Sequence, residues 1–366
     1  MTATEFEAAG LYDPQAPNAA DRLDLLEWLA ARGVTVEQMV ARAARGYLLG
    51  GLAGDLALRP GERYTLTQVA ERAGVPIERV RQLSLAAGLP PIPPAAPVFT
   101  DDDVLLFGGF AGRAALFGDA PVLRFVRTVG SSLARIAEAA VSLFLVNVEG
   151  PMLQDGRSER ALAEANLHAI EGLSGVEVML RSLFRTHMET AISRLRAARG
   201  GRSIDTTYMT IGFVDLVGFT TLSRKMSARE LATLVERFEE AAHDVVTARG
   251  GRLVKLIGDE VMFVALDAAA ACDIALSLFE HFTSDASVTP RGALATGELV
   301  TRGGDYYGPV VNLAARVAQL AVPHELLVTP EVVAHAAASG LRFEPAGKRM
   351  LKGFDEPVAL LTVERA

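Results

Sequence analysis

The stretch LVKLIGDEVMFV, residues 253 to 264, consists of two apolar halves on either side of a Gly-Asp pair. This pair is typical of a tight hairpin turn, because a type II′ turn needs a positive φ at its first central residue. The stretch therefore predicts a β-hairpin with Asp259 at its tip. Lys255 interrupts the first half, although the chain has only four lysines among its 36 cationic residues. Two explanations of this lysine are equally good: a site that needs a compact ammonium group, or chance.

A second apolar stretch, TYMTIGFVDLVGFTTLS at 207 to 223, precedes the hairpin. It begins as a strand, and we expect Asp215 where the apolar run ends, before a segment whose free N–H groups suit phosphate oxygens. If the hairpin lies beside this strand, Asp215 and Asp259 converge, and their charges repel unless a cation lies between them. Mg²⁺ suits such a pair of carboxylates. The alternative is that each aspartate serves only its own turn.

The stretch ATGELVTRGGDYYGPVVNLAARVAQLA, 295 to 321, predicts a loop followed by a helix with a polar face. Two glycines loosen the chain before Asp305, and Pro309 suits the first turn of a helix. Asn312 and Arg316 are four residues apart and share one face of that helix. An amide and a guanidinium on one face can hold a ribose and a phosphate. They can equally be an ordinary solvated face.

Length and composition allow two domains. The 366 residues are 50% hydrophobic and carry a net charge of -8 at pH 7, which argues against a dedicated nucleic-acid binder. The single cysteine, Cys272, fits a reducing compartment. The N-terminus lacks the order of a signal peptide, and no apolar run approaches about 18 residues. We therefore expect a soluble cytoplasmic protein with no transmembrane segment.

The two halves of the chain differ in composition and in the spacing of their apolar residues. Residues 1 to about 200 are rich in Ala, Leu, Arg and Glu at helical spacing and predict an all-α domain. The last part of this half, 158 to 199, predicts linker helices that lead into the second domain. From 204 to 366, short β-like runs alternate with amphipathic helices, which is typical of an α/β or α+β domain.

Four segments in the second half resemble the class III nucleotidyl cyclases, in the order of that family and over roughly 204 to 364. They are FVDLVGFTTLS, KLIGDEVMF, GDYYGPVVNLAARV and LKGFDEPV. The resemblance implies an α+β catalytic domain of the ferredoxin-like class III cyclase fold, in which helices flank a sheet. The helical first half resembles that of soluble actinobacterial adenylyl cyclases, in which such a region regulates the catalytic domain.

The resemblance also implies a role for each matching residue. Two metal ions, Mg²⁺ or Mn²⁺, would be held by two carboxylates and a backbone carbonyl, and the other residues would bind adenine, ribose and phosphate. The implied assignments are metal binding by Asp215, Asp259 and the carbonyl of Leu216, adenine recognition by Lys255 and Asp305, ribose orientation by Asn312, transition-state stabilisation by Arg316, and triphosphate binding by Lys352, with Lys348 as a nearby alternative.

The reaction that the resemblance implies converts ATP to 3′,5′-cyclic AMP and pyrophosphate by two-metal catalysis. Adenine presents an acceptor at N1 and an amino donor at N6, which a lysine and an aspartate complement. Guanine reverses this polarity and leaves both groups unpaired, so ATP is favoured over GTP. Family members build the site across a dimer interface, and one full set of residues in this chain implies a homodimer with two equivalent sites.

The segment YTLTQVAERAGVPIERVRQLSLAAGLPPI, 64 to 92, suggests a rival function. It resembles a helix-turn-helix and, with the residues that follow, the DNA-binding head of MerR-type regulators. The rival is a DNA-binding regulator with a nucleotide-sensing cyclase-like domain. Its arginines are nearly balanced by glutamates, which argues against DNA binding.

The first half offers two further regulatory hypotheses. His168 and His187 lie on the linker helices, and histidine titrates nearest physiological pH, so a response to acidity is one hypothesis and ordinary packing or surface roles are the alternative. The apolar runs at 104 to 117 and 141 to 148 would line a pocket for a lipid or other small-molecule effector, or simply form the core.

Overall fold

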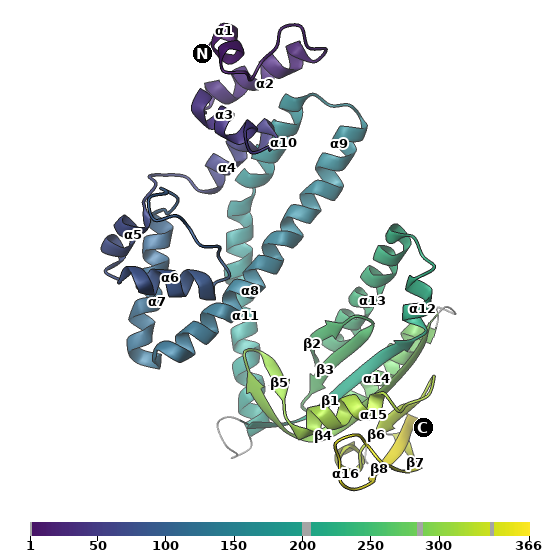
Figure 1. Cartoon of the computed structure of the whole chain (residues 1–366). Coiled ribbons are helices and arrows are strands. Elements are labelled where there is room, and N and C mark those ends of the chain that lie inside the picture. The colour runs from purple at the N-terminus through teal and green to yellow at the C-terminus, as the bar shows by residue number, and fades with distance from the viewer. Residues whose placement is uncertain (1, 200–205, 284–287, 337–339) are drawn as a thin grey trace. The chain divides into compact units, whose positions relative to one another are not determined.

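The structure, a computed structural model, describes residues 2–199, 206–283, 288–336 and 340–366 (Figure 1). The chain divides into two compact units, 1–185 and 186–366. The division falls within the long helix α11, Leu173–Arg199. The domain boundary expected from the sequence, between 200 and 204, lies outside the described residues and stays a prediction.

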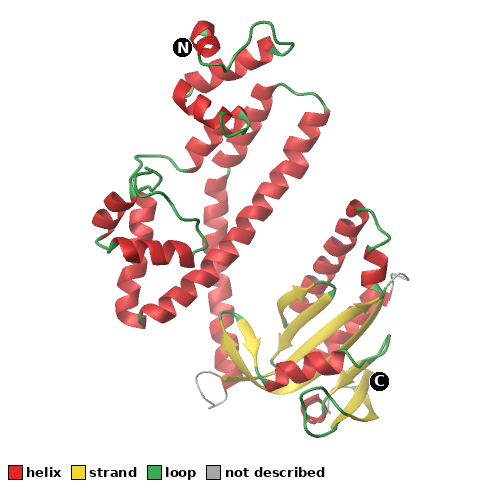
Figure 2. Ribbon diagram, in the orientation of Figure 1, coloured by secondary structure: helices red, strands yellow, loops and turns green. Residues whose placement is uncertain are grey.

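The first unit is helical, as the sequence predicts (Figure 2). Four of its helices, α1, α3, α5 and α7, begin at threonine capping boxes, which satisfy N–H groups that the helix itself leaves free. Besides α11, its elements are α1 Ala3–Ala8, α2 Ala19–Ala31, α3 Val36–Ala43, the 3₁₀ turn η1 Leu49–Gly51, α4 Leu52–Leu58, α5 Leu66–Ala73, α6 Ile77–Ala86, α7 Asp101–Phe117, α8 Asp119–Phe144, the π-helical turn η2 Leu145–Glu149, α9 Gly150–Gln154 and α10 Glu159–Glu171.

Two separate cores hold this unit together. One joins α1 to α4 with α10 and includes Phe6, Leu29 and Ala163. The other joins α5 to α8 and includes Phe107 and Val126. The region thus consists of two helical clusters, each with its own buried apolar residues.

The helices α8 and α9, with η2 between them, form one helical stretch, Asp119–Gln154, that is long and apolar enough to cross a membrane. Only 6% of its most apolar window is buried. The sequence reading missed it because charged residues interrupt every apolar run. One helix that passes this test is weak support for a membrane span.

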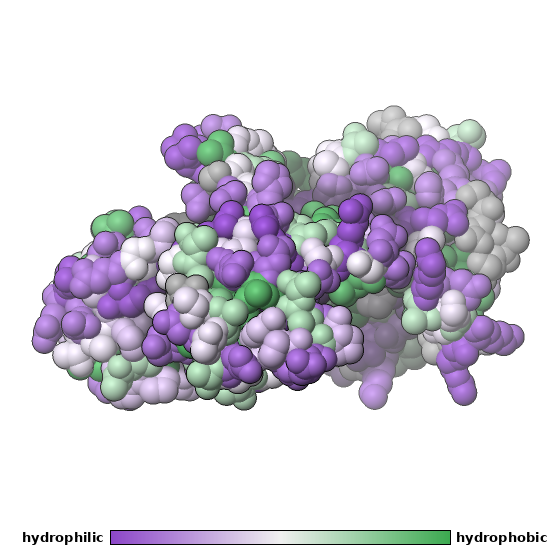
Figure 3. Space-filling model, turned by 90° about the horizontal axis from the view of Figure 1, so that it is seen from above, coloured by the Kyte–Doolittle hydropathy of each residue, from purple (hydrophilic) through white to green (hydrophobic). Residues whose placement is uncertain are grey.

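The face of the molecule drawn in Figure 3 carries apolar residues scattered among hydrophilic ones.

The second unit contains one mixed sheet in the order β2-β3-β1-β4-β6-β8-β7, with β5 paired to β4. All neighbouring strands are antiparallel except β4 and β6. The predicted α+β fold with a sheet flanked by helices is confirmed. The elements are β1 Thr206–Val217, α12 Phe219–Ser223, α13 Ala228–Ala248, β2 Arg252–Ile257, β3 Glu260–Ala265, α14 Ala268–Thr283, β4 Thr289–Arg302, β5 Asp305–Tyr307, α15 Pro309–Ala318, β6 Leu326–Val328, α16 Pro330–Ala336, β7 Leu341–Arg349 and β8 Val358–Arg365.

Each face of the sheet has its own core. On one face α13, α14 and α16 bury residues such as Phe238, Leu278 and Val332 against the strands. On the other face α15 buries Ala314 and Val317 against β1, β3 and β4. We call this second side the α15 face. Side chains alternate between the two faces along each strand, so the register decides which polar residues share the α15 face.

Candidate active site

Asp215 and Asp259 meet beside the β2–β3 hairpin. A two-residue turn joins these strands, and Gly258 has a φ of 66°, as the Gly-Asp pair predicts. β3 pairs with β1, which sets Asp215 opposite Glu260 and next to the turn. The sequence predicts Asp215 at the end of its strand, but β1 continues to Val217. The two residues after Asp215 still pair with β4, so Asp215 lies within the strand.

Two carboxyl groups of this cluster, Asp259 and Glu260, have raised pKa values. Burial raises the pKa of Asp259, and the charge of Asp215 with a hydrogen bond to it raises the pKa further. Burial raises the pKa of Glu260 to about 7, and the charges of Asp215 and Asp259 add to this effect. Both shifts mark a site where an added cation would be stabilised.

Arg291 is the cation that this cluster already contains. It lies on β4 opposite Asp215, and its Nε and Nη2 donate to Asp215 Oδ2 over 2.9 and 2.7 Å. The positive charge of Arg291 offsets part of the rise in the pKa of Asp259 and of Glu260. Sequence reasoning missed Arg291 and Glu260, because only the strand register brings them to the aspartates.

The donor set fits a hard divalent cation. Asp215 and Asp259 supply carboxylate oxygens, and Leu216 lies opposite Pro290, which has no N–H to donate to the Leu216 carbonyl. Among the described residues, no group of three or more His, Cys, Asp or Glu side chains is arranged to hold an ion. Mg²⁺ is commonly held by one or two carboxylates, with phosphate oxygens and water as its remaining ligands.

A bulge in β2 determines where Lys255 points. Arg252 lies opposite Val264 on β3. A shift in register follows, and Lys255 then lies opposite Met262. Both of these β3 residues belong to the core under α15. The bulge therefore turns Arg252 and Lys255 to the α15 face, although they are three residues apart and would otherwise point to opposite faces.

Lys255 and Asp305 form an ion pair, with 2.5 Å between Nζ and Oδ2. The N–H of Tyr306 donates to Asp305 Oδ1 over 2.8 Å. Burial raises the pKa of Asp305, but these two hydrogen bonds and the charges of Lys255 and Arg252 outweigh it, so the pKa lies below its ordinary value. Asp305 is thus held as a charged acceptor.

Asn312 and Arg316 project from the exposed side of α15. Both are exposed, whereas Ala314 and Val317 on the opposite side are buried. Arg316 Nη1 donates to Gln319 Oε1 over 3.4 Å. The shared helical face expected from their spacing is present.

Lys352 lies in the loop between β7 and β8 and is exposed. Leu351 before it is 5% exposed and belongs with Phe354 to the core under α15. These two residues anchor the loop on the α15 face. Lys348 lies on β7 opposite Ala359, so the two lysines occupy different elements.

The helix-turn-helix segment forms as predicted, with α5 ending at Gly74 at a φ of 65° and α6 following Pro76. Its arginines, however, already have partners. Arg63 donates to the carbonyl of Arg59, Arg72 lies 4.0 Å from the centre of the Tyr64 ring, Arg79 pairs with Asp119 over 2.6 Å and Arg81 with Glu78 over 3.8 Å. Few cations are left to neutralise phosphates.

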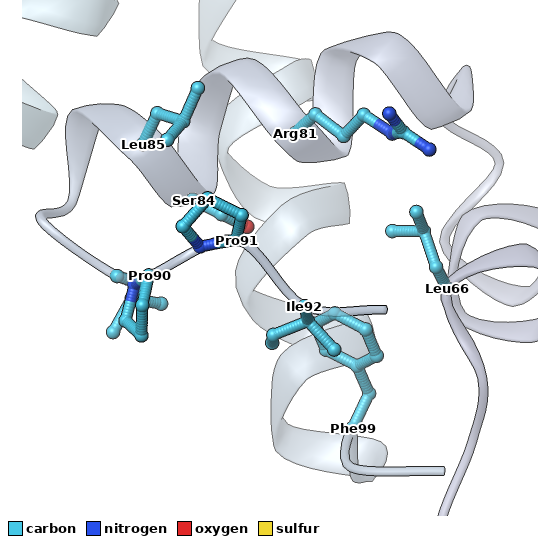
Figure 4. A pocket seen from close by; sticks show the side chains of 9 residues that line it. Leu66, Arg81, Ser84, Leu85, Pro90, Pro91, Ile92 and Phe99 are labelled. Atoms are coloured by element: carbon cyan, nitrogen blue, oxygen red, sulfur yellow. The ribbon is translucent and has the colours of Figure 1, made fainter. Parts of the chain in front are cut away.

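A cavity of about 140 Å³ lies between α6 and the proline-rich segment after it (Figure 4). Its lining is mainly apolar, with Arg81 and Ser84 as polar members. Its lining residues lie between 66 and 99, outside the apolar runs at 104 to 117 and 141 to 148 that the sequence suggested for a pocket.

Comparison with protein families identifies both halves of the chain. Residues 203–362 match the adenylate and guanylate cyclase catalytic domain, and residues 4–192 match the adenylate cyclase regulatory domain. The fold and the site thus define a class III nucleotide cyclase. The chain belongs to the adenylate cyclases of this class that carry an N-terminal regulatory domain.

Three curated relatives are each 33% identical to the chain. An uncharacterised protein of Mycobacterium tuberculosis aligns over 358 residues, 96% of this chain and 92% of its own length. An adenylate cyclase of Streptomyces coelicolor aligns over 331 residues, 89% of this chain and 80% of its own. A protein of M. tuberculosis named a pH-sensitive adenylate cyclase aligns over 366 residues, 94% of this chain and 88% of its own.

Proposed function

We propose that the protein converts ATP to 3′,5′-cyclic AMP and pyrophosphate. The ion pair between Lys255 and Asp305 carries this proposal, because a donor and a charged acceptor side by side complement the N1 and N6 edge of adenine. A purine with the opposite polarity leaves both groups unpaired, which is costly in a closed site. ATP is therefore the substrate, and GTP is discriminated against.

Asp215 and Asp259, with the carbonyl of Leu216, would hold two ions of Mg²⁺ or Mn²⁺. When bound, such ions lower the pKa of the ribose 3′ hydroxyl and neutralise the triphosphate. Glu260 and Arg291 adjoin these ligands, and Arg291 balances the charge of Asp215. The hydrogen bonds from Arg291 restrain the orientation of the Asp215 carboxylate.

The remaining residues act on ribose and phosphate. The 3′ oxygen attacks the α-phosphorus in line and expels pyrophosphate. Arg316 offsets the charge that grows on the α-phosphoryl oxygens, and Asn312 orients the ribose. Lys352 binds the triphosphate as a point charge. The exposure of all three side chains leaves them free to reach a ligand.

We propose a homodimer with two equivalent sites shared between two copies of the chain. In this arrangement the aspartates of one copy face the purine-binding and α15 residues of the other. Exposed large apolar residues in the second unit support a covering partner; they include Ile257, Val300, Tyr307, Leu320, Val322 and Met350.

The test of the function is product formation by the purified full chain. The protein is incubated with ATP or GTP in the presence of Mg²⁺ or Mn²⁺, and cyclic nucleotides are separated and identified. Cyclic AMP from ATP, with much less cyclic GMP from GTP, is the expected result. No cyclic product from either nucleotide would contradict the proposal and leave a nucleotide-binding module.

We also propose that the helical first half of the chain, residues 1 to about 200, regulates a cytoplasmic enzyme in response to pH. The relative named a pH-sensitive adenylate cyclase supports this. His168 and His187 are exposed residues of α10 and α11, and histidine is the residue type whose charge changes nearest physiological pH. The pH profile of a double His168→Asn, His187→Asn chain is compared with that of the parent. Identical profiles would exclude these two residues as the sensors.

The cavity beside α6 is the proposed place for an apolar effector. Its volume suits a short alkyl chain, and Arg81 at its edge suits a carboxylate. Octanoate provides a probe of that chemistry. Calorimetric binding together with a change in activity supports the proposal, whereas no binding at millimolar octanoate contradicts it.

A further inference from the structure

Arg252 forms a second link between β2 and the segment that carries Asp305. Its Nη2 donates to the carbonyl of Gly304 over 2.6 Å. Its guanidinium carbon lies 5.5 Å from the centre of the Tyr306 ring, and Tyr306 is buried in the core under α15. One arginine thus contacts the residues on both sides of Asp305.

The segment that Arg252 contacts is a tight turn with little stiffness of its own. Gly303 and Gly304 join β4 to β5 as a two-residue loop between the paired residues Arg302 and Asp305. Both glycines have a positive φ, 60° and 84°, and glycine restricts the backbone least of all residues. External contacts therefore have to fix the position of this turn.

The bulge in β2 is what makes this contact possible. Without the shift in register between Arg252 and Lys255, their side chains would point to opposite faces of the sheet. With it, both reach the β4–β5 turn. Bulges beside functional sites commonly redirect one side chain in this way.

We propose that Arg252 is a positioning residue for purine selection: it fastens the Gly303–Gly304 turn to β2 and so fixes the Asp305 carboxylate where the amino group of adenine binds. This inference rests on the proposed cyclase function. Arg252 does not contact the substrate. Its positive charge also favours the ionised form of Asp305, which accepts a hydrogen bond from an amino group and cannot donate one.

The experiment measures KM and kcat for ATP and GTP in the full chain and in Arg252→Met. Loss of one charge-assisted hydrogen bond to the turn raises KM for ATP by about tenfold. The value of kcat stays within about twofold, because Arg316 and the aspartates are untouched. KM for GTP is unchanged, so the preference for ATP falls by the same factor. Arg252→Lys, which keeps the charge and one donor, recovers part of the loss.

Arg249→Met is the matched control. Arg249 lies three residues earlier and pairs with Asp273 over 3.0 Å, away from the β4–β5 turn, so its loss leaves the preference for ATP intact. An Arg252→Met chain with parental KM for ATP, or with KM for ATP and GTP raised equally, would overturn the inference.

A second measurement separates this inference from the proposed function. Binding of 3′-deoxy-ATP, which lacks the attacking hydroxyl, is measured by calorimetry in the parent and in Arg252→Met. If the parent forms no cyclic AMP but binds this analogue more tightly than the variant does, the proposed function is wrong and the role of Arg252 is supported. Equal binding in an active parent contradicts the role of Arg252 alone.

Discussion

Lys255 and Asp305 are joined by a contact of 2.5 Å across 50 residues of sequence. Their strands are not neighbours, because β3 and β1 lie between β2 and β4, the strand that pairs with β5. The contact therefore requires both the bulge in β2 and the β4–β5 turn. A pair built from two such local irregularities fits a role in binding better than a role in holding the sheet together.

Replacing Lys255 by alanine separates these two roles. The side chains of Lys255 and Asp305 are 43% and 23% exposed, and pairs of this kind contribute about 0.2 to 1 kcal/mol to stability. We expect Lys255→Ala to raise KM for ATP by about tenfold or more while the free energy of unfolding changes by less than about 1 kcal/mol. Steady-state kinetics and urea unfolding measure the two effects. If the variant keeps the parental affinity and selectivity for ATP, Lys255 is an ordinary surface residue.

Mixing two inactive chains tests the shared sites. Asp215→Ala and Arg316→Ala each disable every site of their own homodimer. In an equal mixture half of the dimers are mixed, and each has one intact site, so about a quarter of the parental activity returns. Co-purification with two different tags confirms that mixed dimers form. Mixed dimers without activity would show that each chain carries its own complete site.

Two glycines test the packing of the structure. A Cβ on Gly212 would lie 2.3 Å from the Phe263 ring and 2.7 Å from Leu294, so Gly212→Ala costs about 1 to 3 kcal/mol. Gly175 lies within α11, and no described atom outside its own stretch of helix lies within 4 Å of a Cβ there, so Gly175→Ala stabilises the helix by up to about 1 kcal/mol. Urea denaturation of both variants measures these changes. Equal stability of the two variants would be incompatible with this packing.

The single cysteine tests burial and pH dependence together. Burial raises the pKa of the Cys272 thiol to about 12, whereas an unfolded cysteine titrates near pH 8.5. At pH 8 the native thiol therefore resists Ellman's reagent, and the unfolded chain reacts. Between about pH 8.5 and 12 only the unfolded chain loses this proton, so stability falls as pH rises.

The size of that fall is measured against Cys272→Ala, because other groups titrate in the same range. From pH 8 to pH 10 the parent is expected to lose about 2 kcal/mol more than the variant. Rapid labelling of the folded parent at pH 8, or the same pH dependence in both chains, would show that the thiol is accessible.

Patterns within a single segment gave the most reliable predictions. The Gly-Asp pair predicted the hairpin, because a positive φ at Gly258 is a local requirement. The spacing of Asn312 and Arg316 predicted their shared face, because helix geometry is regular. Alternating β-like and amphipathic segments predicted the α+β domain.

Features that depend on register or on distant strands could not be read in advance. Arg291 and Glu260 join Asp215 only through pairing across three strands. Arg252 joins Lys255 only because a bulge reverses the alternation of side chains. The helical stretch at 119–154 passed unnoticed, because scattered charged residues divide its apolar residues into short runs.

The rate of cyclic AMP formation in Arg316→Ala, measured beside Gln319→Ala, is the sharpest single measurement. Gln319 accepts a hydrogen bond from Arg316 over 3.4 Å on the same helix end and has no proposed role in the chemistry. Loss of a group that stabilises charge in the transition state lowers kcat by about 100-fold or more, so we expect this loss in Arg316→Ala and nearly parental kcat in Gln319→Ala. Parental kcat in Arg316→Ala would contradict the assignment of the α15 face as the catalytic surface.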